Sequence, residues 1–216
     1  MNILFIGNSY TYFNDMPMLF KALSEENSKA VNVYSVTHGG HKLYEYARGD
    51  DEYTKKIAEL LKEYSFDICF LQEQSVLPIK DYELFEAGLT ELKEKLSGSV
   101  KKFILYQTWG RAEGNAMLEE LGMTNKEMTE ALVSAYDKAA KKLNAEVSPV
   151  GESFYAVYSG DNDINLYNDD LTHSSYKGSC LAALVHYKTV FGSFPENTDS
   201  LELTDEELLV FKKALK

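Results

Sequence analysis

Short apolar runs alternate along this chain with longer segments in which apolar residues recur at helical spacing. The run at 67–71 is apolar almost throughout, and the run at 31–36 is rich in β-branched residues. Runs of this length and continuity are typical of strands that are buried on both faces of a parallel sheet. The pattern therefore predicts strands at 2–6, 31–36, 67–71, 102–107 and 146–149.

The longer segments have the pattern of amphipathic helices. In the segment 52–63, Ile57, Leu60 and Leu61 share one helical face. Thr204 is followed by three acidic residues, which is a helix-start signal. These patterns predict helices at 17–28, 52–63, 82–96, 125–143, 174–191 and 204–215.

The alternation of strand and helix predicts an α/β fold, with a parallel sheet covered by helices on both faces. No repeat, low-complexity tract or linker interrupts the pattern, so residues 1–216 are expected to form a single domain. Ligands bind such sheets at the carboxyl ends of the strands. The loops expected at that edge are 7–11, 38–42, 72–75 and 108–111.

Three side chains offer the chemistry of nucleophilic catalysis. Ser9 follows the first predicted strand, and Asp170 and His173 lie three residues apart near the other end of the chain. A serine hydroxyl is a weak nucleophile that needs a histidine to take its proton and a carboxylate to orient the imidazole. One turn of backbone can present both Asp170 and His173. The sequence therefore predicts Ser9 as nucleophile, His173 as base and Asp170 as its orienting acid.

The order of these motifs resembles the SGNH (GDSL-type) hydrolases. The motifs are Gly7-Asn8-Ser9, with asparagine where the family has aspartate, then Gly39-Gly40, and finally Asp170-Leu171-Thr172-His173. The resemblance implies a flavodoxin-like α/β/α sandwich of about five strands. It also implies that the backbone N–H groups of Ser9 and Gly40 stabilise the oxyanion of an acyl-transfer reaction.

One motif departs from the family pattern, which has Gly-x-Asn after the third strand. This chain has Gln72-Glu73-Gln74-Ser75 there, so we expect a divergent branch in which a Gln-x-Gln pair replaces Gly-x-Asn. Either Gln74 or Gln72 can supply the carboxamide donor, because Asn and Gln carry the same NH₂ group. Trp109, after the fourth strand, is a core ring or a platform for a sugar or acyl group.

The net charge of the chain limits the binding partners that are expected. The formal net charge is −12, which disfavours nucleic acids and anionic membrane surfaces as partners and favours a small-molecule ester. The N-terminal apolar run is too short for a signal peptide or a membrane span, so a cytoplasmic protein is expected, although a removed leader would leave the same sequence. The oligomeric state stays open.

Other reactive side chains have simpler interpretations. Cys69 and Cys180 lie in apolar patterns and are expected to be buried hydrophobes. His38 and His41 lack a third ligand at a metal-binding spacing, so they are expected at the site rim and no metal or cofactor is expected. His186 is expected to be structural. Arg111, two residues after Trp109, can pair with one of the many acids or bind a substrate carboxylate, and the ion pair is favoured.

These observations predict a serine esterase that hydrolyses a small acyl ester, with O-acetyl carbohydrate as one candidate substrate. The altered Gln72/Gln74 segment leaves a second hypothesis, a carbohydrate- or acyl-binding module that keeps the scaffold without turnover. A flavodoxin-like nucleotide binder is disfavoured, because Gly7-Asn8-Ser9 lacks a phosphate-binding glycine pattern.

Overall fold

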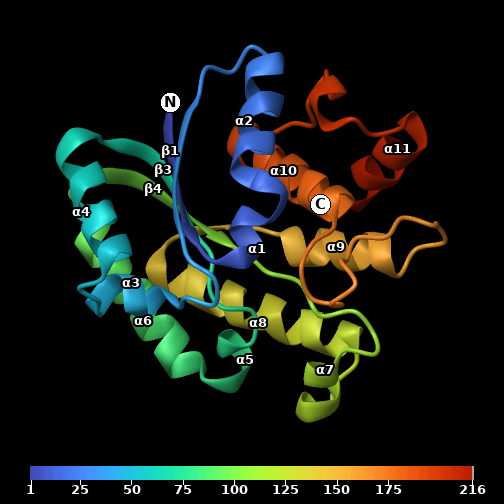
Figure 1. Cartoon of the computed structure of the whole chain (residues 1–216), viewed down its shortest axis with the longest axis horizontal. Helices are drawn as coiled ribbons and strands as arrows, with labels where there is room; N and C mark the ends of the chain where they lie inside the picture. Colours follow the sequence, from blue (N-terminus) through green and yellow to red (C-terminus); the bar gives the residue numbers. More distant parts are fainter. Residues whose placement is uncertain (216) are drawn as a thin grey trace.

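A computed structural model describes residues 1–215, so only residue 216 of the predicted domain lies outside the described part (Figure 1). Within it, five parallel strands form one sheet in the order β2-β1-β3-β4-β5. The predicted strands are confirmed, with ends displaced by a residue or two. The strands are β1 (Asn2–Gly7), β2 (Asn32–Thr37), β3 (Phe66–Leu71), β4 (Val100–Tyr106) and β5 (Glu146–Ser148).

The predicted helices are also present. They are α2 (Met16–Glu26), α4 (Glu52–Glu63), α6 (Tyr82–Leu96), α8 (Asn125–Leu143), α10 (Tyr176–Phe191) and α11 (Asp205–Ala214). Thr204 begins α11 with a reciprocal capping box to Glu207, as the sequence signal predicts.

Shorter helical elements were not predicted, because most of them have only one or two turns and show too few apolar repeats to reveal their period. These are α1 (Ser9–Tyr12), the 3₁₀ turn Phe13–Asp15, α3 (Leu43–Arg48), α5 (Leu77–Lys80), α7 (Ala116–Leu121), α9 (Val150–Tyr158) and the 3₁₀ turn Asp199–Leu201.

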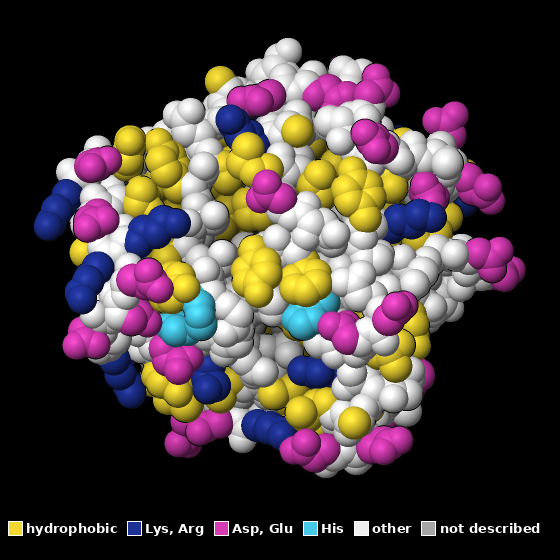
Figure 2. Space-filling view, in the orientation of Figure 1, with side chains coloured by type: hydrophobic (Ala, Val, Ile, Leu, Met, Phe, Trp, Pro, Cys, Tyr) yellow, Lys and Arg dark blue, Asp and Glu magenta, His cyan; other side chains and the backbone are white. Residues whose placement is uncertain are grey.

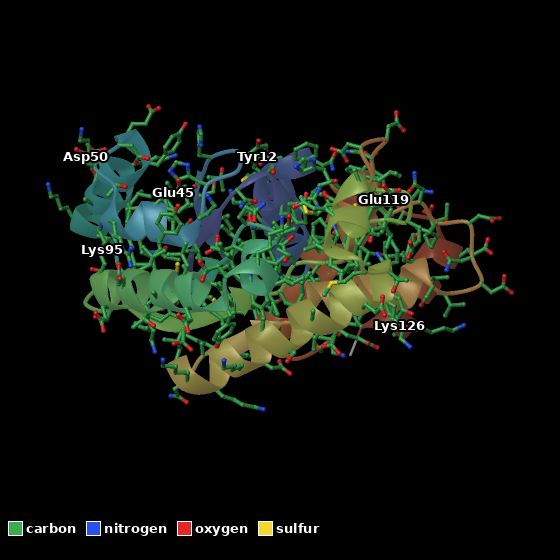
Figure 3. The ribbon with its side chains drawn as sticks, turned by 90° about the horizontal axis from the view of Figure 1, so that it is seen from below. Tyr12, Glu45, Asp50, Lys95, Glu119 and Lys126 are labelled. Carbon is green, nitrogen blue, oxygen red and sulfur yellow. The ribbon has the colours of Figure 1, made fainter. Side chains whose placement is uncertain are left out.

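The helices cover both faces of the sheet, which gives the three-layer α/β/α sandwich that the sequence predicts (Figure 1). Alternate residues of β1 point to opposite faces of the sheet. On one face, Ile3 and Phe5 share a core with α2, α9, α10 and α11. On the other face, Leu4 and Ile6 share a core with α3, α4, α6 and α8. In the perpendicular view, α6 and α8 run on one side of the molecule (Figure 3). Burial on both sides explains why the central strands are continuously apolar.

The strand order places a crevice at the end of β1. The chain leaves β1 for β2 on one side and then returns to β3 on the other, so neighbouring connections pass to opposite faces and separate at the carboxyl ends of β1 and β3. Ligands bind α/β sheets at such a switch point. The loops that follow β1, β2 and β3 therefore meet where Ser9 lies.

The structure also describes the two cysteines and the apolar character of the helices. Cys69 and Cys180 are both buried and unpaired, as expected for small hydrophobes. Within residues 1–215, none of the helices combines the length and the apolar character that crossing a membrane requires.

Candidate active site

The structure brings Ser9, His173 and Asp170 into one hydrogen-bonded row. The Nε2 atom of His173 lies 2.8 Å from the Oγ atom of Ser9, and its Nδ1 atom lies 2.5 Å from Oδ2 of Asp170. Ser9 is the first residue of α1 and is separated from β1 by Asn8, whereas the other two side chains come from the turn before α10. When Nδ1–H donates to Asp170, Nε2 is free to accept the Ser9 hydroxyl proton. This is the arrangement that activates a serine.

The turn that carries Asp170 and His173 is held by the carboxylate itself. Oδ1 of Asp170 accepts hydrogen bonds from the backbone N–H groups of Thr172 and His173, each at 2.9 Å. Burial raises the pKa of the Asp170 carboxyl, but the hydrogen bonds from the His173 ring and from these two backbone N–H groups outweigh burial and hold the pKa below its ordinary value. The carboxylate therefore stays ionised beside the imidazole at neutral pH.

Aromatic rings fix the plane of the His173 imidazole. The Phe13 ring stacks on it with centroids 4.2 Å apart and planes 5° from parallel, and the Tyr10 ring lies at 5.6 Å. Both rings belong to the short helical segments directly after Ser9. The segment that supplies the nucleophile thus also orients the base.

The nucleophile loop is clamped by a pair of carboxamides. The backbone N–H of Asn8 donates to Oε1 of Gln72 at 2.8 Å, and Nε2 of Gln72 donates back to Oδ1 of Asn8 at 2.9 Å. Oε1 of Gln72 also accepts from the Thr11 hydroxyl. A side chain on Gly7 would place its Cβ 2.5 Å from Gln72 Oε1, so glycine is required for this approach.

Asparagine at position 8 has a second role that aspartate could not perform. Its Nδ2 group donates to the backbone carbonyl of His41 at 2.9 Å, which joins the loops after β1 and β2. A carboxylate at this position would face that carbonyl without a proton to share. Asparagine at position 8 therefore has a local physical reason.

The expectation that Gln72 is a candidate oxyanion donor is therefore corrected. It is buried, and its NH₂ group is engaged with Asn8 and with the backbone carbonyl of Glu73. Gln74, and not Gln72, is the glutamine that lines the cavity beside Ser9. Its Oε1 accepts from the N–H groups of Val76 and Leu77 at 3.0 Å each, which leaves its NH₂ group for the cavity.

The two predicted backbone donors reach the same cavity. Gly40 lines it and has φ +74°, a left-handed conformation that favours glycine. In the part of the chain that the structure describes, neither the Gly40 nor the Ser9 backbone N–H donates a hydrogen bond. Both donors are available to a ligand.

Trp109 does not line the cavity, so its interpretation as a substrate platform is corrected to that of a core ring. It is buried, stacks on Phe154 and Tyr10 with centroids 4.1 and 4.5 Å apart, and donates from Nε1 to the Thr172 carbonyl. Trp109 therefore supports the active-site turn from the core side. A lone tryptophan after a strand carries no sequence signal that distinguishes these two positions.

Arg111 also differs from expectation, because no acid of residues 1–215 pairs with it. Its Nη1 donates to the Thr172 hydroxyl at 3.0 Å and its Nη2 donates to the Ser75 hydroxyl at 3.1 Å. The side chain is half-buried and lines the cavity. Of the two alternatives that the sequence offers for Arg111, the favoured ion pair is therefore wrong, and the abundance of acids explains why it was favoured.

Glu73 is a further residue that sequence reasoning missed. It is fully buried and accepts hydrogen bonds from the backbone N–H groups of Leu43 and Gln74, the latter at 2.6 Å. Burial raises the pKa of its carboxyl to about 8, although those two N–H groups oppose the shift. Glu73 thus links the loop after β2 to the residue that bears the cavity-facing carboxamide.

The remaining histidines lie apart from the catalytic row. The Nδ1 atoms of His38 and His41 lie 3.0 Å apart, and Nε2 of His41 lies 3.0 Å from Asp51. No group of three metal-ligating side chains was found among residues 1–215. His186 is fully buried against Phe5 and other core rings, and burial lowers its pKa to about 3.

The cavity over these groups has a volume of about 350 Å³. Its lining residues are Asn8, Ser9, Tyr10, Gly40, Gln74, Ser75, Arg111, Asp170, Thr172 and His173. Figure 2 shows two histidine side chains on this face, with hydrophobic side chains between and above them and a hollow beside one. In Figure 3 Tyr12 lies at the edge of the molecule, between Glu45 of α3 and Glu119 of α7.

The comparisons with solved structures agree on the fold. The chain is 29% identical to a protein from Slackia heliotrinireducens described as a candidate SGNH hydrolase, with a TM-score of 0.77 over 88% of this chain and 98% of that one. A DUF4886 family protein from Bacteroides uniformis has a TM-score of 0.80 at 17% identity, over 100% of this chain and 93% of that one. An acetyl xylan esterase from Geobacillus stearothermophilus has a TM-score of 0.64 at 16% identity, over 91% and 97%.

No family model and no curated protein sequence matches the chain. The structural neighbours nevertheless include hydrolases and esterases, and the fold is SGNH-like. The likeness to the Bacteroides and Geobacillus proteins is one of fold, because their identities with this chain are low.

Proposed function

We propose that this protein is a serine esterase that hydrolyses a small acyl ester. The observation that carries the proposal is the row from Ser9 through His173 to Asp170, with contacts of 2.8 and 2.5 Å. The esterases among the structural neighbours support the same reaction class. The modest cavity volume favours a short acyl group.

The proposed reaction has two steps. Ser9 Oγ attacks the ester carbonyl carbon while its proton passes to Nε2 of His173, and the tetrahedral intermediate then expels the alcohol, which takes that proton. Water attacks the acyl-serine in the second step, with His173 again as base. The carboxylic acid leaves and the Ser9 hydroxyl is restored.

Charge on the tetrahedral oxygen would be met by three donors. These are the backbone N–H groups of Ser9 and Gly40 and the NH₂ group of Gln74. Donors of this kind are worth about 3–4 kcal/mol each in the transition state. Gln74 would take the place of the family's asparagine, and its capped Oε1 gives it a defined orientation.

An acetyl group on a carbohydrate is the substrate that we propose. Two of the structural neighbours are acetyl xylan esterases. The exposed Tyr12, whose hydroxyl lies close to Gly39 next to the cavity-lining Gly40, offers an aromatic surface for a sugar ring. The fold by itself does not choose among esters.

A fluorophosphonate probe read by intact mass tests the nucleophile. We expect a single adduct on the native chain and none on Ser9→Ala with an unchanged circular dichroism spectrum. Ser75→Ala is the matched control, because Ser75 also lines the cavity but has no histidine partner; it should still be labelled. Labelling of Ser9→Ala would exclude Ser9 as nucleophile, and no labelling of folded native protein would favour the binding-module alternative.

A further inference from the structure

The cavity contains a guanidinium that no carboxylate neutralises. The chain has 34 acidic residues and only two arginines. Arg48 forms a bidentate pair with Glu91, with both contacts at 2.6 Å. Arg111 instead meets only the hydroxyls of Ser75 and Thr172, and none of the ion pairs in residues 1–215 includes it. An arginine without a counterion inside a cavity is a site for an anionic ligand.

The position of this guanidinium is fixed from both sides. Thr172 Oγ1 accepts from Arg111 and from Asn115 Nδ2 and donates to the Asp170 carbonyl, so its hydrogen-bonding capacity is used. Ser75 holds Nη2 from the loop after β3. Arg111 is therefore tied to the same turn that presents Asp170 and His173 to Ser9.

The free donors of Arg111 point to a planar anion. A guanidinium has five N–H groups. One on Nη1 and one on Nη2 are taken by hydroxyls, and the Nε–H is buried without a partner. One N–H on each terminal nitrogen remains, and these two donors match the two oxygens of a carboxylate. Asp170 lines the same cavity and Arg111 is the one arginine or lysine there, so a monoanion fits better than a phosphate dianion.

We propose that Arg111 binds a carboxylate carried by the ester substrate, so that the enzyme prefers esters with a carboxylate close to the scissile bond. This inference rests on the proposed esterase function and narrows its substrate class. The carboxylate can belong to the acyl part or to the alcohol part, for example to an acidic sugar. Both sources present the same chemistry to the guanidinium.

A purely structural role for Arg111 makes a different prediction. If the side chain only joins Ser75 to Thr172, its loss should impair the hydrolysis of charged and uncharged esters equally. A carboxylate subsite requires a selective loss. The quantity that separates the two is the ratio of kcat/KM for a charged ester to that for its uncharged analogue.

The experiment compares two pairs of esters. Mono-4-nitrophenyl succinate and its methyl ester place the carboxylate on the acyl side, whereas 3-acetoxybenzoate and its methyl ester place it on the alcohol side. We expect Arg111→Gln to lower the charged-to-uncharged ratio about 10- to 100-fold for one pair, the loss of two charge-assisted hydrogen bonds. Arg111→Lys should lower it less, since lysine keeps the charge without the fork.

Arg48→Gln is the matched control, because it removes the other arginine from a surface ion pair and should leave the ratio unchanged. The pair whose ratio falls identifies the side of the ester that carries the carboxylate. A ratio that Arg111→Gln leaves unchanged for both pairs would overturn the carboxylate subsite while leaving the esterase proposal intact.

Failure of the esterase proposal has a separate signature, in which native protein hydrolyses none of these esters. Calorimetric titration with benzoate and with benzamide then decides the subsite. Binding of benzoate alone, lost in Arg111→Gln, would support it. Equal binding by native protein and Arg111→Gln, or no benzoate binding by native protein, would overturn it.

Discussion

Glu73→Gln is the substitution whose effect the structure defines most sharply. The Glu73 carboxyl is fully buried, and its contacts among the described residues are backbone N–H groups rather than cations. Burial raises the pKa of this carboxyl from its ordinary value of 4.5 to about 8. Glutamine keeps one acceptor oxygen for these N–H groups but has no charge to bury.

The sign of the effect follows from proton linkage. In the unfolded chain the Glu73 carboxyl loses its proton near pH 4.5, whereas in the folded chain it keeps the proton up to about pH 8. Between these values the folded state binds more protons, so the free energy of unfolding falls as pH rises. One pKa unit is worth about 1.4 kcal/mol, so the full penalty, reached above pH 8, is on the order of 5 kcal/mol.

The assay is urea unfolding of the native chain and Glu73→Gln at several values between pH 5.5 and 8. The native chain should lose about 3 kcal/mol of stability relative to the variant across this range, equivalent to about 6–12 °C in Tm. Any constant cost of placing an NH₂ group opposite the Leu43 N–H cancels in this difference. Glu130→Gln, a substitution of an exposed glutamate, should follow the native chain.

Parallel stability curves for the native chain and Glu73→Gln across this pH range would refute the reasoning. They would mean that the Glu73 carboxyl keeps an ordinary pKa despite its burial. The backbone N–H groups of Leu43 and Gln74 would then stabilise the carboxylate more than burial destabilises it.

Three further substitutions test the site and its support. Gln74→Glu keeps the oxygen that accepts from the N–H groups of Val76 and Leu77 but removes the NH₂ donor. We therefore expect kcat to fall about 10²- to 10³-fold while the protein stays folded. Activity near the native value would exclude the carboxamide from the oxyanion site. Asn8→Asp should lower stability by about 1–3 kcal/mol, measured by thermal unfolding, because it removes the donor to the His41 carbonyl. His186→Phe should remove the part of the stability loss between pH 6.5 and pH 4 that comes from this imidazole, since the buried ring stays neutral to about pH 3 while the unfolded chain takes up a proton. The same difference in urea midpoint between the two proteins at pH 4 and at pH 7 would contradict this.

The sequence by itself determined the architecture. Strands that are buried on both faces must be continuously apolar, so the central strands could be predicted to within a residue or two. The long helices showed their period, whereas α3 and α7 were too short to do so, and α9 contains a glycine that obscures its pattern. Ser9, Asp170 and His173 could be named because they occupy turns whose residue types suit one reaction.

Only the tertiary structure decided what the neighbouring side chains do. Gln72 and Gln74 are equivalent in a pattern of residue types, but the pairing of β3 with β1 places Gln72 against Asn8 and leaves Gln74 facing the cavity. Trp109 and Arg111 follow the same strand, yet one is buried in the core and the other lines the cavity without a carboxylate partner. Local patterns encode period and turns, whereas the partner of a donor or a charge depends on which distant loops meet at the edge of the sheet.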